Sequence, residues 1–233
     1  SFNKLIKDIK DILSLSLSKI PDVTYSKLTF LLKNRRLPNL KNPTYFNDKL
    51  LSMKLYSNRD PQHKKLVDKY AVRDYIKESI GEKYLIPLIG VYSDPSEVDF
   101  DSLPNKFVLK LTSGSQNNLI CTDKSKLDWQ ESTDKIRKWL KIDPYIRTRE
   151  WQYKDLPNRF VIEEYISDSE GNTNDYKFWC FHGQPHMVQI DVDRFSNQKR
   201  GFYDVKTFEE IDVRMGYDNP KPSPEKPNNF SEM

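Results

Sequence analysis

The sequence is poor in the residues that build disulfide frameworks and zinc sites. Among 233 residues there are only two cysteines, Cys121 and Cys180, and three histidines. Each cysteine lies in an apolar, strand-like run, which is typical of a buried free thiol. Two of the histidines fall in the short segment 182–186, whose composition favours a hairpin turn. We therefore expect neither a disulfide scaffold nor a histidine-based metal centre.

Long apolar runs and a strong charge excess are also missing. No apolar stretch reaches the roughly eighteen residues that span a bilayer, and the first residues lack the compact apolar region of a signal peptide. The expected location is therefore cytoplasmic. The 38 basic and 34 acidic residues are mixed along the chain and leave a net charge of +4. This balance does not indicate a nucleic-acid partner, whereas nucleotide or sugar-phosphate ligands remain compatible with it.

The hydrophobic content is low, so aromatic residues must supply much of the volume of the hydrophobic core. Hydrophobic residues make up 36% of the chain, but 12% of all residues are aromatic, and their bulk favours a folded protein. Helical patterns come first and strand patterns follow, so the predicted fold class is α+β. The expected helices span 25–33, 46–56, 63–80 and 129–142, and the expected strands span 85–92, 107–112, 119–122, 159–166, 176–181, 187–195 and 201–204.

We expect three parts along the chain. A helical part covers 1–82, a central part with a lysine-bearing strand covers 83–158, and a β-rich part covers 159–233. The proline-rich end, from 219 on, is typical of a linker or extended segment. Residues 2–13 form an amphipathic pattern whose polar face mixes both charge signs. Such a pattern favours packing on the domain over lying in a membrane interface.

The most informative segment is 107–118, with the sequence FVLKLTSGSQNN. Lys110 interrupts an apolar strand, so its charge must be solvated, paired or bound to an anion such as phosphate. The small polar loop that follows contains Ser113, Gly114 and Ser115, through which backbone N–H groups could approach phosphate oxygens. The spacing is not that of a P-loop. Read alone, the segment also fits an ordinary solvated lysine before a turn.

Two later strands carry paired charges. Strand 159–166 contains Glu163 and Glu164, and because consecutive strand side chains alternate, one of them faces inward. In the next strand Asp175 and Lys177 share one face, an arrangement suited either to a ribose and phosphate or to a surface ion pair.

Together these blocks resemble the ATP-grasp superfamily, in particular its TupA-like branch, which is associated with teichuronopeptide, capsule and exopolysaccharide biosynthesis. The resemblance runs from about residue 37 to the end. It rests on ordered blocks: LPNLKNPTYFNDKL, DKYAVRDYIKESIGEKYLIPLIGVY, LPNKFVLKLTSGSQNN, RTREWQYKDLPNRFVIEEYI and DYKFWCFHGQPHMVQIDVDRF.

The resemblance implies an ATP-grasp-like fold in which two antiparallel β-containing subdomains sandwich ATP. It also implies that Lys69 and Lys110 hold the phosphates with the loop Ser113, Gly114 and Ser115. The strand end Glu163, Glu164, Tyr165 and Ile166 would form the adenine-binding hinge. Asp175 would contact the ribose, while Lys177 and Arg194 would act on phosphate or on an acyl phosphate, and Trp179 would either line the pocket or lie in the core.

Two departures from the branch are visible. The usual His-Gly-Ser-Gly loop is replaced by Ser113-Gly114-Ser115-Gln116. The acidic and amide residues that would bind Mg²⁺ are expected beyond the proline-rich end, so no metal ligands are assigned and the third part is expected to be incomplete.

The activity that the resemblance implies is ATP-dependent ligation of a carboxylate to an amine, with ATP and Mg²⁺ as cofactors. The carboxylate would be a small molecule or polysaccharide precursor, and the protein would associate peripherally with a membrane-bound polysaccharide assembly system. Two alternatives remain open: a glycosyltransferase that uses a nucleotide sugar, for which Asp191-Val192-Asp193 supplies only the letters of a DxD motif, and a non-catalytic module that binds nucleotide or precursor.

Overall fold

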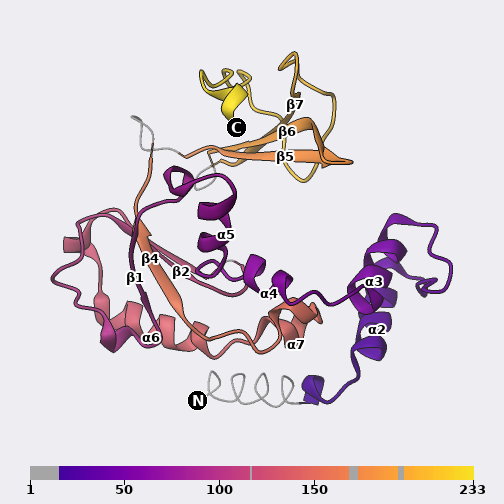
Figure 1. Cartoon of the computed structure of the whole chain (residues 1–233), viewed down its shortest axis with the longest axis horizontal. Coiled ribbons are helices and arrows are strands. Elements are labelled where there is room, and N and C mark those ends of the chain that lie inside the picture. The colour runs from indigo at the N-terminus through magenta and orange to yellow at the C-terminus, as the bar shows by residue number, and fades with distance from the viewer. Residues whose placement is uncertain (1–15, 116, 168–172, 194–196) are drawn as a thin grey trace. The chain divides into compact units, whose positions relative to one another are not determined.

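The computed structural model describes residues 16–115, 117–167, 173–193 and 197–233 (Figure 1). The chain forms two compact units, Ser1–Tyr165 and Ile166–Met233. Helices and two antiparallel sheets make the fold α+β, as the sequence predicts. The finer three-part division at 82 and 158 stays a prediction. The opening amphipathic pattern lies outside the described residues. No described helix is both long and apolar enough to cross a membrane.

The first unit begins with helices that pack through a small apolar cluster. In α2 (Asp22–Asn34) and α3 (Phe46–Tyr56), Phe30, Leu51 and Leu55 face one another because they recur at helical spacing. Helix α2 ends where Arg35 adopts a left-handed conformation with φ 53° and its N–H bonds to the Leu31 carbonyl. These two predicted helices are confirmed.

The single helix expected over 63–80 is wrong. The structure has two shorter helices, α4 (Gln62–Val67) and α5 (Val72–Ser79). Asp68 lies between them in an extended conformation, and its carboxylate accepts bonds from the N–H groups of Tyr70 and Ala71 at 2.8 and 2.9 Å. Aspartate competes with the helix in this way because its short side chain bonds nearby backbone donors.

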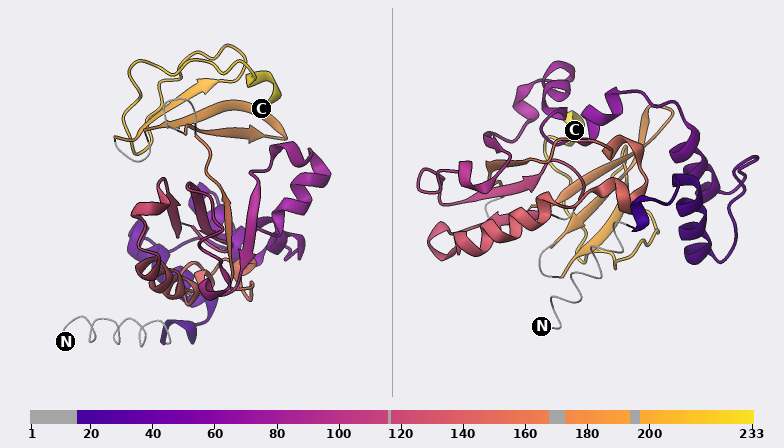
Figure 2. Two further views of the ribbon diagram at one scale, coloured as in Figure 1. Left: turned by 90° about the vertical axis from the view of Figure 1, so that its left-hand side faces the viewer. Right: turned by 90° about the horizontal axis from the view of Figure 1, so that it is seen from below.

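A four-stranded antiparallel sheet forms the core of the first unit. Its order is β1 (Leu88–Tyr92), β4 (Phe160–Glu164), β2 (Phe107–Leu111), β3 (Asn118–Cys121). Helix α6 (Trp129–Leu140) lies along one face (Figure 2) and contributes Ile136, which is 0% exposed, to the cluster around Phe107 and Leu109. The Asp128 side chain caps this helix by accepting from the Glu131 N–H.

The second unit is a three-stranded meander. Strands β5 (Asp175–Phe181), β6 (Gln184–Val192) and β7 (Lys199–Asp204) pair in sequence order. The predicted turn joins the first two, with His182 and Gly183 at positive φ. Tyr176 and Phe178 pack on one apolar face with Val188, Ile190 and Tyr203. The proline-rich end has little regular structure, but its Phe230 packs into this same cluster.

The prediction for the cysteines is half right. Cys121 is buried, whereas Cys180 is exposed. The strand register shifts between Trp179 and Cys180, next to the hairpin turn, so the thiol lies beyond the packed part of the strand. The remaining short elements are α7 (Pro144–Thr148) and the 3-10 turns η1 (Glu82–Tyr84), η2 (Pro95–Glu97), η3 (Lys124–Lys126), η4 (Trp151–Tyr153) and η5 (Phe230–Glu232).

Candidate functional site

Strand alternation places Lys110 on the sheet face opposite α6. Phe107, Leu109 and Leu111 point into the core, so Lys110 points the other way, beside Val161 of β4 in the strand register. The ammonium is not freely solvated. Its Nζ lies 2.7 Å from Oε2 of Glu163, which projects from the same face of β4.

Glu163 is the centre of a three-residue charge cluster. Its side chain is 9% exposed and lies between Lys110 and Arg73, whose Nη1 is 2.9 Å from Oε1. Arg73 also donates to the Ile86 carbonyl at 2.8 Å, so α5 is tied to the sheet through one guanidinium. A nearly buried carboxylate needs such partners. The prediction that one of the two glutamates faces inward is confirmed, because Glu164 is exposed.

Lys69 comes from the break between α4 and α5 and reaches the same region. Its backbone N–H donates to the Thr112 carbonyl at 2.9 Å, and its Nζ donates to the Gly114 carbonyl at 2.7 Å. Burial lowers the pKa of Lys69, and the positive charge of Lys110 lowers it further. The two lysines that the sequence analysis selected are therefore neighbours. Lys69 contacts the polar loop, and Lys110 lies in the strand that leads into this loop.

The loop after β2 is shaped by one glycine. Gly114 has φ +77°, and a Cβ there would lie 3.1 Å from Cγ of Pro144 in α7, so both conformation and space favour glycine. Ser113 is buried and Ser115 is exposed. The buried hydroxyl of Thr112 has no hydrogen-bond partner among the described residues. Gly114 and Ser115 line a cavity of about 420 Å³ together with Arg147 and Tyr153, while Gln116 lies outside the described residues.

The predicted hinge follows β4 without a break. Tyr165 is partly buried, with its ring centroid 5.9 Å from Nζ of Lys106, and Ile166 is exposed. The hinge residues that follow Glu163 therefore lie at the end of β4, as their order in the sequence requires. The assignment of this segment to adenine stays a prediction.

A second charge cluster lies in the second unit. Lys177 Nζ is 3.0 Å from Asp175 and 2.7 Å from Asp191, and Arg200 donates to Asp191 at 2.6 and 3.1 Å. Burial raises the pKa of Asp191, but hydrogen bonds from Arg200, Lys177 and Gln189 outweigh it and hold the pKa at about 2. The predicted pair Asp175 and Lys177 is therefore part of a larger network.

Sequence reasoning missed Arg73, Gln189, Asp191 and Arg200 as partners in these clusters. In the sequence Asp191 is a charge inside the expected strand 187–195, and Arg200 directly precedes the expected strand 201–204. Their contact was not predictable because it depends on the register that places them opposite each other in β6 and β7. Asp191, the first residue of the DxD-like letters, is ion-paired with Lys177 and Arg200. Arg194 lies outside the described residues. Within the described ranges no group of three or more His, Cys, Asp or Glu residues could hold a metal ion.

Comparison with known families identifies a family that matches most of the chain. The family model described as TupA-like ATP-grasp matches residues 48–233, which include Lys69, Lys110 and both charge clusters. No curated protein and no solved structure matches the chain. Because the match covers most of the sequence, this chain belongs to the TupA-like ATP-grasp family.

Proposed function

We propose that the protein is an ATP-dependent carboxylate–amine ligase that acts in the biosynthesis of a cell-surface polysaccharide. Membership of the TupA-like ATP-grasp family supports an ATP-dependent, ligase-like activity. Among particular residues, the main support for the proposal is the pair of neighbouring lysines, Lys69 and Lys110, beside a polar loop. Two cations held this close are suited to a polyphosphate, whose negative charge offsets their mutual repulsion.

The residues of the first unit fit a nucleotide phosphate chain. Lys69 and Lys110 keep donor capacity, since an ammonium has three N–H groups and each Nζ contacts a single oxygen among the described residues. The unpartnered Thr112 hydroxyl and the loop backbone at Gly114 offer further donors. Glu163 fixes Lys110 through the 2.7 Å contact, so the lysine is positioned before the ligand binds.

We include Mg²⁺ in the proposal because of the family membership, not because particular residues of this chain are assigned as metal ligands. When bound, Mg²⁺ would offset the negative charge of the phosphates during phosphoryl transfer. The described residues offer no three-ligand acidic group, so we assign no metal ligands and derive no step through the ion.

The proposed reaction has two steps. A substrate carboxylate oxygen attacks the γ-phosphorus of ATP, the bond to the β-phosphate oxygen breaks, and ADP and an acyl phosphate result. An amine nitrogen then attacks the acyl carbon, inorganic phosphate leaves, and the nitrogen loses a proton to give an amide. In this scheme Lys69 and Lys110 hold the phosphates, and Lys177 and Arg194 are the proposed catalytic cations. The proposed location is cytoplasmic, with peripheral association to a membrane-bound assembly system.

Calorimetric titration with Mg·ATP, UDP-glucuronate and UDP-glucose tests this proposal. Selective binding of Mg·ATP is the expected result, and phosphate release on addition of paired carboxylates and amines should follow. Selective binding of a UDP-sugar would contradict ligation and favour glycosyl transfer. Binding of Mg·ATP with no phosphate release across a broad panel of carboxylates and amines would favour a binding module.

A further inference from the structure

Helix α7 lies against the polar loop that follows β2. A Cβ at Gly114 would be 3.1 Å from Cγ of Pro144, the first residue of α7. Two cavities, of about 420 and 160 Å³, are each lined by loop residues together with Pro144. The Gly114 carbonyl in turn accepts from Lys69 Nζ at 2.7 Å. The position of α7 therefore limits where the loop backbone and the Lys69 ammonium can lie.

This helix is too short to be stable by itself. It has five residues, and a helix of that length forms only where tertiary contacts hold it. The last carbonyl groups of a helix also need partners from outside it. The Arg147 carbonyl accepts from the Tyr25 hydroxyl of α2 at 3.1 Å. The Thr148 carbonyl accepts from Lys54 Nζ of α3 at 2.9 Å, so both helices stabilise the end of α7.

Asp22, in the first turn of α2, ties the two helices together through its charge. The Tyr145 hydroxyl of α7 donates to this carboxylate and lies 2.7 and 2.6 Å from its two oxygens. Arg149, which caps α7, has Nη1 3.4 Å from the same carboxylate, and its other terminal nitrogen donates to the Leu17 carbonyl. The Arg149 side chain is 2% exposed, so its charge depends on such partners. Hydrogen bonds to a carboxylate are stronger than those between neutral groups.

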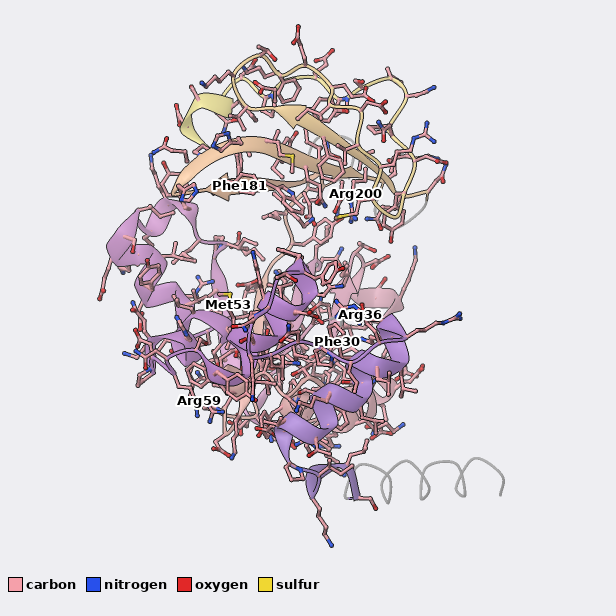
Figure 3. All side chains as sticks on the ribbon, turned by 90° about the vertical axis from the view of Figure 1, so that its right-hand side faces the viewer. Phe30, Arg36, Met53, Arg59, Phe181 and Arg200 are labelled. Carbon is pink, nitrogen blue, oxygen red and sulfur yellow. The ribbon has the colours of Figure 1, made fainter. Side chains whose placement is uncertain are left out.

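These contacts join the nucleotide site to a part of the chain outside the family match. Asp22 precedes the matched segment, which begins at residue 48. It belongs to the helix pair α2 and α3, in which Figure 3 labels Phe30 and Met53. Within the described residues its hydrogen bonds and ion pair go to Tyr145 and Arg149, and none goes to the loop or its lysines.

We propose that Asp22 and Tyr145 are positioning residues of the nucleotide site. They hold α7 against the loop, and the loop then holds Lys69 and its own backbone N–H groups in place for the phosphates. The identity of the ligand rests on the proposed function, whereas the coupling of α2 to the loop does not. Without this coupling the loop would have to be ordered during binding, which weakens affinity although no contact to the ligand is lost.

Amide hydrogen exchange of the unliganded protein tests the coupling without any nucleotide. Tyr145→Phe deletes the hydroxyl but keeps the ring, and Asp22 keeps its contact with Arg149, so the protein should remain folded. The segment Ser113–Ser115 should exchange about two- to thirtyfold faster in the variant, while β2 should be unchanged. Tyr56→Phe, which deletes a hydroxyl from a 58% exposed residue of α3, is the control and should alter neither segment. Unchanged exchange in the loop of Tyr145→Phe would overturn the inference.

Calorimetric titration with Mg·ATP tests the effect on the ligand. The Kd of Tyr145→Phe should rise about two- to thirtyfold, the range expected for a residue that acts on a site without touching it. Ile136→Val, a core change on the sheet face that α6 covers, is the stability control. At a comparable loss of thermal stability it should leave the Kd unchanged. Equal losses of affinity in both variants would show that the effect is one of general stability and would reject the positioning role.

A double-mutant cycle identifies the path from Tyr145 to the loop. Pro144→Ala removes the ring that lies against Gly114, so Tyr145→Phe should add little to it. The Kd of the double variant should stay within about twofold of the higher single-variant Kd. If the two single effects multiply, Tyr145 acts independently of Pro144 and the proposed path is wrong. If the unchanged protein does not bind Mg·ATP, the nucleotide proposal fails, and the exchange experiment alone decides whether α2 positions the loop.

Discussion

Replacing Lys110 with alanine tests the core of the nucleotide site. In the free protein Nζ of Lys110 is 2.7 Å from Glu163, and this glutamate is also held by Arg73 at 2.9 Å. The substitution therefore removes one of two cations around a nearly buried carboxylate. The unfolding free energy should fall by only about 1–2 kcal/mol, because the Arg73 contact persists and Lys110 is itself 25% exposed.

The effect on ATP binding should be larger than the effect on stability. One charge-assisted contact to phosphate contributes about 1.5–3 kcal/mol, which corresponds to roughly a tenfold to hundredfold rise in Kd. The variant also leaves the Glu163 carboxylate with less compensating charge near the phosphates. Adding Glu163→Gln to Lys110→Ala removes that negative charge, so the double variant should bind ATP more tightly than the single variant.

ATP affinity is measured by calorimetric titration with Mg·ATP, and stability is measured by thermal unfolding of the same samples. Lys126→Ala is the control, because that lysine is 82% exposed and its ion pair, with Asp123 at 3.3 Å, is an exposed surface contact. It should change neither affinity nor stability appreciably. A folded Lys110→Ala protein with unchanged ATP affinity would refute the assignment of this lysine to phosphate.

Three further substitutions probe other parts of the structure. Gly114→Ala should lower the unfolding free energy by about 1–2 kcal/mol and weaken ATP binding, because the φ of +77° and the approach of Pro144 oppose a side chain; thermal unfolding and titration check both. Ile136→Ala, at a 0% exposed position under the sheet, should cost about 2–5 kcal/mol in urea unfolding, and a smaller loss would argue against the packing of α6. The pKa of Asp191 lies at about 2, below its ordinary 3.8, so its contribution to stability is present above about pH 4 and is lost as the pH falls toward 2. At pH 7 the unfolding free energy of Asp191→Asn should therefore be lower than that of the unchanged protein by on the order of 2 kcal/mol. Between about pH 4 and pH 2 the variant should lose less stability than the unchanged protein. Parallel acid titrations of both proteins, followed by circular dichroism, would expose an error in this reasoning.

Local patterns in the sequence determined most of the elements. The helix Phe46–Tyr56 and the start of α6 at Trp129 agree with their predicted bounds, and β2 begins at Phe107 as expected, because apolar periodicity and turn residues act over a few residues. The expected helix over 63–80 failed for an equally local reason. The carboxylate of Asp68 bonds to the next two free N–H groups and interrupts the helix, and periodicity alone does not reveal this.

The sequence by itself thus determined the α+β class, the family and the identity of Lys69 and Lys110 as candidate phosphate ligands. Only the tertiary structure decided which charges meet. Glu163 and Lys110 are 53 positions apart in the chain, and they pair because β2 and β4 are neighbours in the sheet. Strand register likewise sets Arg200 against Asp191 in the second unit. Such contacts depend on long-range pairing, whose register is fixed by burial of a whole sheet face rather than by any short motif.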